Sequence, residues 1–146
     1  MKALRHTGIV VKDLEKMLRF YRDLLGFKVI EKKNESSRYI DTILKLKKVM
    51  VTTVKMAADD GSLIELLCFD SHPRSISIKK YLCNTGFSHI AFTVNDIEAE
   101  YGKLRKRGIK FNSLPQVSPD GYAKVVFFCD PERNFIEIVE EMNKND

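Results

Sequence analysis

Hydrophobic and polar residues follow the same succession of patterns twice along this chain of 146 residues. Each half opens with a β-rich segment in which apolar residues partly alternate with polar ones: LRHTGIVV (4–11) and FSHIAFTV (87–94). Asp13 and Asp96 follow these segments and are suited to cap the N-terminus of a helix. The pattern therefore predicts a strand followed by a helix at the start of each half.

The predicted helices each carry one apolar stripe at helical spacing. Gly26 and Gly108 come where a helix end favours a left-handed residue. The stripe residues are Leu14, Met17, Leu18, Tyr21, Leu24 and Leu25 in the first half, and Ile97, Tyr101 and Leu104 in the second.

Further strands are expected after each helix, separated by turn signals. The first half predicts strands at 27–33, 39–46, 49–57 and 62–69, and the second at 109–113, 122–130 and 134–141. The segment NESSRYIDTILKLKK (34–48) is also compatible with a short helix. The expected fold class is α+β, with two tandem βαβββ modules and a mostly antiparallel sheet.

The two halves also match residue by residue. When HTGIVVKDLE (6–15) is laid over HIAFTVNDIE (89–98), the His, Val, Asp and Glu residues coincide, and LIELL (63–67) later matches FIEIV (135–139). Such ordered self-similarity indicates an internal duplication. We expect one domain over residues 1–146, with module 1 at about 1–75, a linker at about 70–85 and module 2 at about 85–146.

Composition narrows the functional classes. The hydrophobic fraction of 44% and the charged fraction of 31% are globular values, and the net charge of +5 is modest. Three cysteines form no CxxC pair, and neither a signal peptide nor a membrane-length apolar run is evident. We expect a cytoplasmic protein that acts on a small molecule rather than on nucleic acid or a membrane.

The duplication repeats one His near the start and one Glu near the end of each module: His6 with Glu65, and His89 with Glu137. By strand alternation all four belong to largely apolar faces, where a carboxylate is costly unless it is paired or bound to a cation. Two imidazoles and two carboxylates suit a divalent ion such as Ni²⁺, Co²⁺, Zn²⁺, Mn²⁺ or Fe²⁺. Four protein ligands leave positions open for substrate, which favours a catalytic site.

The segments RHTGIVVKDLEKMLRFYRDLLGFKV, SLIELL, FSHIAFTVNDIE and DPERNFIEIVE resemble those of the vicinal oxygen chelate superfamily. This superfamily includes glyoxalase I, methylmalonyl-CoA epimerase, extradiol dioxygenases and fosfomycin- or bleomycin-resistance proteins. The resemblance implies paired modules that form a cupped sheet around one metal, within one chain or across a homodimer. It places the metal ligands at His6, Glu65, His89 and Glu137.

The second carboxylate at Glu65 is most similar to bacterial-type glyoxalase I. That resemblance implies a lyase or isomerase in which the metal stabilises an enediolate, Glu137 is the principal base, and Glu65 is a ligand or second base. The substrate would be a small molecule, such as an anionic thiol adduct or a thioester. Alternatives are an epimerase of the methylmalonyl-CoA type, an extradiol-type dioxygenase, or a small-molecule-binding resistance protein.

Two positions depart from glyoxalase I. Val10 stands where that enzyme usually carries an Arg for glutathione, and Phe69 stands where an Asn commonly follows the first ligand Glu. An epimerase would need a second catalytic carboxylate, for which Glu35 and Asp41 are the candidates. Cationic residues that could meet an anionic tail are Arg38, Lys45 and Arg74.

Overall fold

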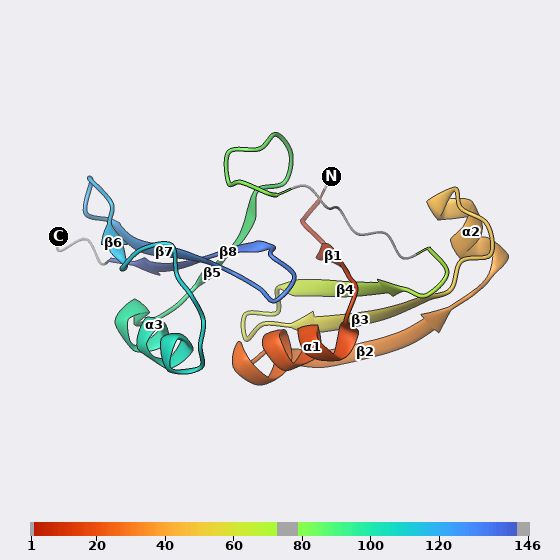
Figure 1. Cartoon of the computed structure of the whole chain (residues 1–146), viewed down its shortest axis with the longest axis horizontal. Helices are drawn as coiled ribbons and strands as arrows, with labels where there is room; N and C mark the ends of the chain where they lie inside the picture. The colour runs from red at the N-terminus through yellow and green to blue at the C-terminus, as the bar shows by residue number, and fades with distance from the viewer. Residues whose placement is uncertain (1, 73–78, 143–146) are drawn as a thin grey trace. The chain divides into compact units, whose positions relative to one another are not determined.

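The computed structural model describes residues 2–72 and 79–142. The chain divides into two compact units, residues 1–77 and 78–146, which we call module 1 and module 2. Figure 1 labels the elements of each.

Module 1 contains a four-stranded sheet in the order β1-β4-β3-β2, in which β1 runs parallel to β4 and the other neighbours are antiparallel. Its elements are β1 (Thr7–Val11), α1 (Leu14–Leu18), a π-helix (Arg19–Leu24), β2 (Lys28–Glu35), α2 (Arg38–Leu44), β3 (Val51–Ala57) and β4 (Leu63–Phe69).

Module 2 repeats this topology in the order β5-β8-β7-β6, with β5 parallel to β8. Its elements are β5 (His89–Thr93), α3 (Ile97–Lys106), β6 (Gln116–Val117), β7 (Ala123–Cys129) and β8 (Phe135–Glu141). The predicted α+β class with two βαβββ modules is confirmed.

Each sheet has one face packed by a helix. In module 1 this face buries Ile9, Val11, Ile64 and Leu66 beneath Met17, Leu18 and Tyr21; in module 2 it buries Val126, Phe128, Ile136 and Ile138 beneath Ile97 and Leu104. Alternation sends Glu65 and Glu137 to the opposite side of their strands. We call this opposite side the open face of each module.

The first helix differs from the predicted stripe. After Leu18 it widens into a π-helix, in which the Leu25 amide donates to the Phe20 carbonyl at 3.0 Å. In this π-helix Phe20 and Tyr21 are both buried, while the predicted stripe residues Leu24 and Leu25 are only half-buried. Gly26 and Gly108 have φ of 86° and 87°, as predicted for residues after a helix.

Of the two possibilities for this segment, the short helix within 34–48 is confirmed and the strand at 39–46 is wrong, because Arg38–Leu44 form α2. Ser37 caps the helix by accepting from the Ile40 amide, and Lys45 ends it in a left-handed conformation with φ 54°. Ile40 belongs to a buried cluster with Val49 and Val51. Leu67 and Phe69, on the open face, pack against that cluster, so α2 covers the end of this face.

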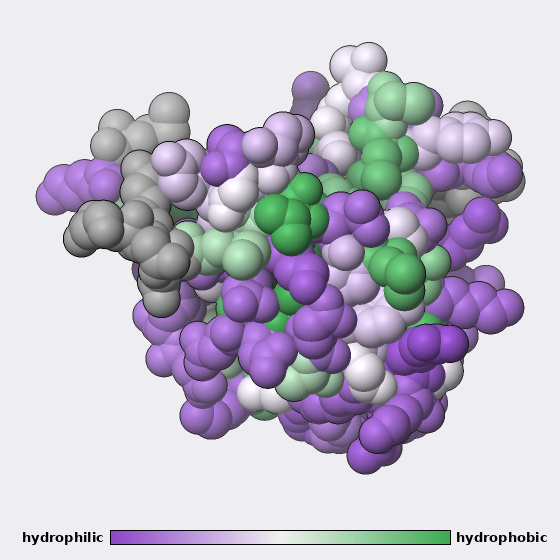
Figure 2. Space-filling view, turned by 90° about the vertical axis from the view of Figure 1, so that its left-hand side faces the viewer, coloured by the Kyte–Doolittle hydropathy of each residue, from purple (hydrophilic) through white to green (hydrophobic). Residues whose placement is uncertain are grey.

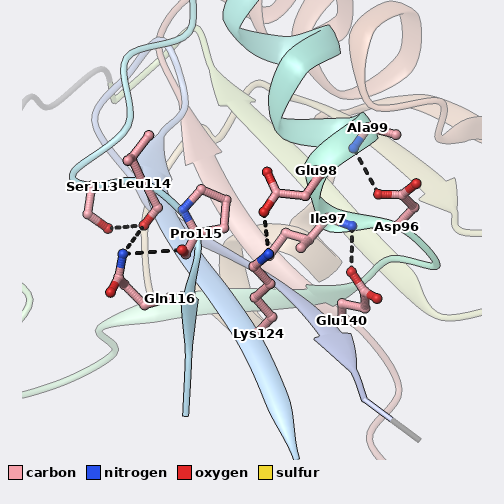
Figure 3. A network of polar contacts seen from close by, with 10 residues as sticks. All are labelled: Asp96, Ile97, Glu98, Ala99, Ser113, Leu114, Pro115, Gln116, Lys124 and Glu140. Atoms are coloured by element: carbon pink, nitrogen blue, oxygen red, sulfur yellow. Dashed lines mark hydrogen bonds and ion pairs between the residues drawn. The ribbon is translucent and has the colours of Figure 1, made fainter. Parts of the chain in front are cut away.

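The strand predicted at 109–113 is also wrong. Phe111 makes only an isolated bridge with Phe128, and the edge strand β6 begins later, at Gln116. Between them, Ser113 and Gln116 donate side-chain hydrogen bonds to nearby carbonyls, as Figure 3 shows. These local bonds compete with the sheet ladder, and Pro115 has no amide hydrogen to contribute to it.

The start of α3 is fastened to its sheet by polar side chains (Figure 3). Asp96 accepts from the Ala99 amide at 2.9 Å, and Glu140 of β8 accepts from the Ile97 amide at 2.8 Å. Lys124 of β7 pairs with Glu98. Figure 2 shows a mostly hydrophilic molecular face on which hydrophobic residues form separate patches.

The Asp96→Ala variant is expected to lower the free energy of unfolding by about 1 kcal/mol, because the first turn of α3 loses its capping acceptor. Urea titration followed by circular dichroism checks this value. Asp96→Asn keeps an acceptor oxygen and should lose less, so equal losses in both variants would contradict the capping role.

Candidate functional site

Module 1 brings the predicted His6 and Glu65 together. His6 lies directly before β1 and Glu65 lies in the middle of β4, with His6 Nε2 3.2 Å from Glu65 Oε2. The Glu65 side chain is only 13% exposed, although it lies on the open face, because neighbouring side chains cover it.

Module 2 repeats the same contact. His89 Nε2 lies 3.2 Å from Glu137 Oε2, and the Glu137 side chain is 17% exposed. The parallel strand pairs produce this match, since Gly8 is aligned with Glu65 and Ala91 is aligned with Glu137. In each module the His lies two residues before the residue that is aligned with the Glu. The His–Glu contact therefore runs diagonally between the two parallel strands.

Small residues at these crossing positions keep the diagonal open. A Cβ atom added at Gly8 would lie 3.3 Å from Leu67 Cδ1, which is a tight contact. Ala91 has the smallest side chain after glycine, a single methyl group. In both modules the His is followed two positions later by a small residue, and this repeated spacing is a further sequence signal for the His–Glu contact.

The surroundings of the two pairs differ in charge. Lys55 of β3 is aligned with both Glu65 and Glu31, and its Nζ lies 3.6 Å from Glu65 Oε1 and 3.1 Å from Glu31 Oε2. Lys33 Nζ lies 2.7 Å from the other Glu31 oxygen. A row of alternating charges thus runs from Glu65 through Lys55 and Glu31 to Lys33 across the open face of module 1.

These ion pairs also shift the pKa values of the groups beside the His–Glu pair. Hydrogen bonds from Lys33 and then Lys55 lower the pKa of Glu31. The hydrogen bond to Glu31 raises the pKa of Lys55, and the charges of Glu65 and Glu31 add to that rise while burial opposes it. Lys55 therefore keeps its positive charge beside Glu65.

In module 2 the position equivalent to Lys55 is Phe127, which is aligned with Glu137. The rings of His89 and Phe127 meet edge to face, with centroids 5.1 Å apart. Glu137 therefore faces an aromatic wall where Glu65 faces a cation. The sequence analysis missed both Lys55 and Phe127, which the strand register would have identified.

The donor atoms fit a divalent metal. Two donors held about 2.1 Å from one ion, at angles between octahedral and tetrahedral, lie about 3.0 to 3.4 Å apart. The observed separation of 3.2 Å in both modules falls in this range. His89 Nδ1 also lies 2.7 Å from Ser88 Oγ, so an Nδ1–H tautomer would bond Ser88 and leave the Nε2 lone pair for a metal.

Each module by itself supplies two donors. Across the described ranges, 2–72 and 79–142, no three His, Cys, Asp or Glu side chains gather closely enough to hold a metal. His6 Nδ1 is buried without a hydrogen-bond partner within the same ranges. We call each His–Glu pair a half-site, and the predicted set of four ligands stays a prediction.

Of the two candidates for a second catalytic carboxylate, Asp41 has a structural role. Asp41 accepts the Lys48 amide at 2.9 Å and the Val49 amide at 2.8 Å, so its carboxylate holds the loop after α2. Glu35 ends β2. Arg38 and Lys45 lie at the two ends of α2, whereas Arg74 lies outside the described residues.

The two residues that depart from the glyoxalase I pattern are both apolar and lie on the open face of module 1. Val10 is 62% exposed and aligned with Leu67, and Phe69 packs against the buried cluster beneath α2. Neither position offers a hydrogen bond to a substrate. The end of this face beyond Glu65 is therefore an apolar wall.

The family model of the glyoxalase, bleomycin resistance protein and dioxygenase superfamily matches residues 3–138. The chain belongs to this superfamily. The resemblance found in the sequence is thereby confirmed, and it covers both half-sites.

Individual relatives agree with this assignment. A probable lactoylglutathione lyase from Synechocystis is 31% identical over 98% of this chain and 98% of its own length. A glyoxalase family protein from Bacillus cereus has the same fold, with a TM-score of 0.86 at 23% identity over 98% and 96% of the two chains. The fosfomycin resistance protein FosX from Listeria monocytogenes, solved with Mn(II), has a TM-score of 0.66 at 14% identity over 97% and 94%.

The Asp41→Asn variant is expected to unfold at a lower temperature at neutral pH, because an amide offers one acceptor oxygen where the carboxylate uses two. The Val49 and Lys48 amides lower the pKa of Asp41. Its contribution is therefore complete above the unfolded pKa, about 4, and is lost as the pH falls through the lower folded pKa.

Thermal melts between neutral and strongly acidic pH should show the difference between wild type and Asp41→Asn shrinking as the pH falls. Asp59→Asn, which removes an exposed partner of Lys28, serves as the control and should change little. A constant difference at all pH values would contradict this role of Asp41.

Proposed function

We propose that this protein is a divalent-metal-dependent lyase or isomerase of the glyoxalase type, with His6, Glu65, His89 and Glu137 as metal ligands. The observation that carries the proposal is the repeated 3.2 Å contact between His Nε2 and Glu Oε2 on the open face of each module. A metal between like-charged carboxylates would offset their repulsion. Lactoylglutathione lyase-like relatives and a fold shared with an Mn(II)-containing protein support it.

The two glutamates would have different roles in the reaction. Glu65 has His6 at one oxygen and Lys55 at the other, so its orientation is fixed from both sides. Glu137 has His89 at one oxygen and the Phe127 ring at its aligned position. We assign Glu137 as the base that removes and returns the proton, because among the described residues no cation lies beside it to compete for that proton.

The surroundings of the half-sites suit this chemistry. A bound divalent ion supplies positive charge to the substrate oxygens, which makes the neighbouring C–H bond more acidic. The apolar side chains of Leu67, Phe69 and Phe127 exclude water near the glutamates, which strengthens local electrostatic interactions. His6 and His89 would hold the ion through Nε2, beside the carboxylate oxygens of Glu65 and Glu137.

The substrate class differs from that of a standard glutathione enzyme. Val10 and Phe69 offer no polar group where such an enzyme holds glutathione, and α2 closes the same end of the face. We therefore expect a small molecule with adjacent oxygens that is recognised by other residues. The epimerase, dioxygenase and resistance-protein alternatives become outcomes of the substrate test below.

A homodimer is part of the proposal. Leu4 and Phe87 lie two residues before His6 and His89, at matching positions in the duplication, and they are 87% and 111% exposed. Large apolar side chains exposed at both equivalent positions suit burial by association. Sedimentation velocity tests this, and a purely monomeric protein at micromolar concentration would refute it.

Metal affinity provides the first test. Wild-type protein freed of metal and titrated with Ni²⁺, Co²⁺, Zn²⁺ or Mn²⁺ should bind one ion per pair of modules, measured by calorimetry. His89→Ala and Glu65→Gln should weaken binding at least 100-fold, because each removes a direct ligand. His72→Ala removes an imidazole that pairs with Ser71 instead, so it serves as a control and should bind like wild type.

Proton transfer provides the second test. Wild-type, metal-loaded protein in D₂O should exchange a substrate C–H for deuterium in a panel of methylglyoxal–thiol adducts and methylmalonyl-CoA. Glu137→Gln loses a proposed ligand and should bind metal more weakly, so it is assayed at saturating metal, where it should still lower this exchange by about 10² to 10⁴-fold. Nuclear magnetic resonance follows the exchange.

Two results would contradict the assignment of the base. One is wild-type exchange in Glu137→Gln, and the other is oxygen consumption with catechols in place of exchange. Exchange with methylmalonyl-CoA alone would identify the epimerase alternative.

A further inference from the structure

Module 2 contains a cavity of about 340 Å³ beside its half-site. The described residues that line it are Lys79, Lys80, Tyr81, Leu82, Asn112, Cys129, Arg133 and Phe135. Three of these residues are cations and, among the described lining residues, none is a carboxylate.

The cations are held in place by contacts that leave their charge available. Lys79 Nζ lies 5.1 Å from the centre of the Tyr81 ring, and Lys80 Nζ donates to Asn134 Oδ1 at 3.4 Å. Within residues 79–142, no salt bridge joins Lys79, Lys80 or Arg133 to a carboxylate. A neutral amide and an aromatic face orient these groups without cancelling their charge.

Arg133 occupies a backbone position that favours glycine. Its φ is 69°, in the left-handed region, and it lies in the turn between β7 and β8. The buried Asp130 holds this turn by accepting from the Glu132 and Asn134 amides and from the Asn134 side chain. Strained backbone conformations concentrate at functional sites, so a ligand-binding role of the Arg133 side chain would explain why a long cationic residue occupies this turn.

The cavity lies next to the His89–Glu137 half-site on the open face of module 2. Phe135 lines it, is aligned with His89, and lies two residues before Glu137, or about 7 Å along the strand. Cys129 is aligned with Phe135 and also lines the cavity. Burial and then the charge of Asp130 raise the pKa of the Cys129 thiol, while the charge of Arg133, which also lines the cavity, opposes this rise.

We propose that this cavity is a binding subsite for an oxyanion, a carboxylate or phosphate group, held by Arg133 together with Lys79 and Lys80. Arginine's planar fork matches either group through two parallel hydrogen bonds. This proposal rests on the proposed function only where the oxyanion is taken as part of the substrate. In that case the substrate's negative group is held by module 2.

The test is an anion titration of the full-length, metal-free protein with inorganic phosphate and, separately, with malonate. Amide chemical shifts measured by nuclear magnetic resonance should show saturable changes at residues around Arg133 and Lys80. Arg133→Gly should weaken the affinity at least fivefold, while its thermal midpoint stays the same or rises because glycine relieves the positive φ.

Lys45→Gly is the matched control. It removes one cation from another left-handed position, with φ 54° at the end of α2 in module 1, and should leave anion affinity unchanged. Arg133→Asn supplies a second variant that tolerates the same conformation and should weaken binding like Arg133→Gly.

Equal affinity in wild type and both Arg133 variants, or shifts spread evenly over surface lysines, would overturn the subsite. Because the protein is metal-free in this titration, the outcome is independent of the metal proposal. Glu137→Gln should bind the anion like wild type even if it has lost proton transfer. A catalytically silent protein with a saturable, Arg133-dependent anion site would therefore refute the proposed function and support the subsite.

Discussion

The diagonal contact between one histidine and one glutamate across a parallel pair of strands constrains each module. The contact requires β1 beside β4 and β5 beside β8, so that a residue at the start of the module meets one near its end. It also requires a small residue at the crossing position, which Gly8 and Ala91 provide. The helix packs on the other face of each sheet, where alternation places the buried apolar residues.

Duplication preserved this contact and changed what surrounds it. Beside Glu65 is Lys55, and at the equivalent place beside Glu137 is Phe127. The first environment fixes a carboxylate through charge, and the second leaves it without a neighbouring cation among the described residues. In module 1, α2 covers one end of the open face with an apolar cluster, whereas module 2 has a cationic cavity. These differences allow two similar half-sites to have different roles.

Much of the fold could be predicted because the chain contains two copies of each signal. Each prediction of a helix cap, a helix end or a His–Glu pair was supported by the equivalent residue in the other half. These equivalent residues are Asp13 and Asp96, Gly26 and Gly108, and the paired His and Glu residues. The strand predictions at 39–46 and 109–113 were wrong because local contacts outweighed strand-like composition. The segment at 39–46 has strand-like composition, yet the Ser37 cap and Ile40 burial made it helical. The contacts of Lys55, the strain at Arg133 and the phase of the π-helix depend on register and packing, which apolar periodicity does not reveal.

The central claim is that both half-sites bind one metal ion, and X-ray absorption spectroscopy of the Co²⁺- or Ni²⁺-loaded protein tests it most directly. The account predicts two imidazole nitrogens among the nearest neighbours, with the remaining donors being oxygen at about 2.1 Å. His6→Ala and His89→Ala should each reduce the imidazole contribution from two to one. A wild-type spectrum with no imidazole, or one unchanged by either substitution, would contradict the claim.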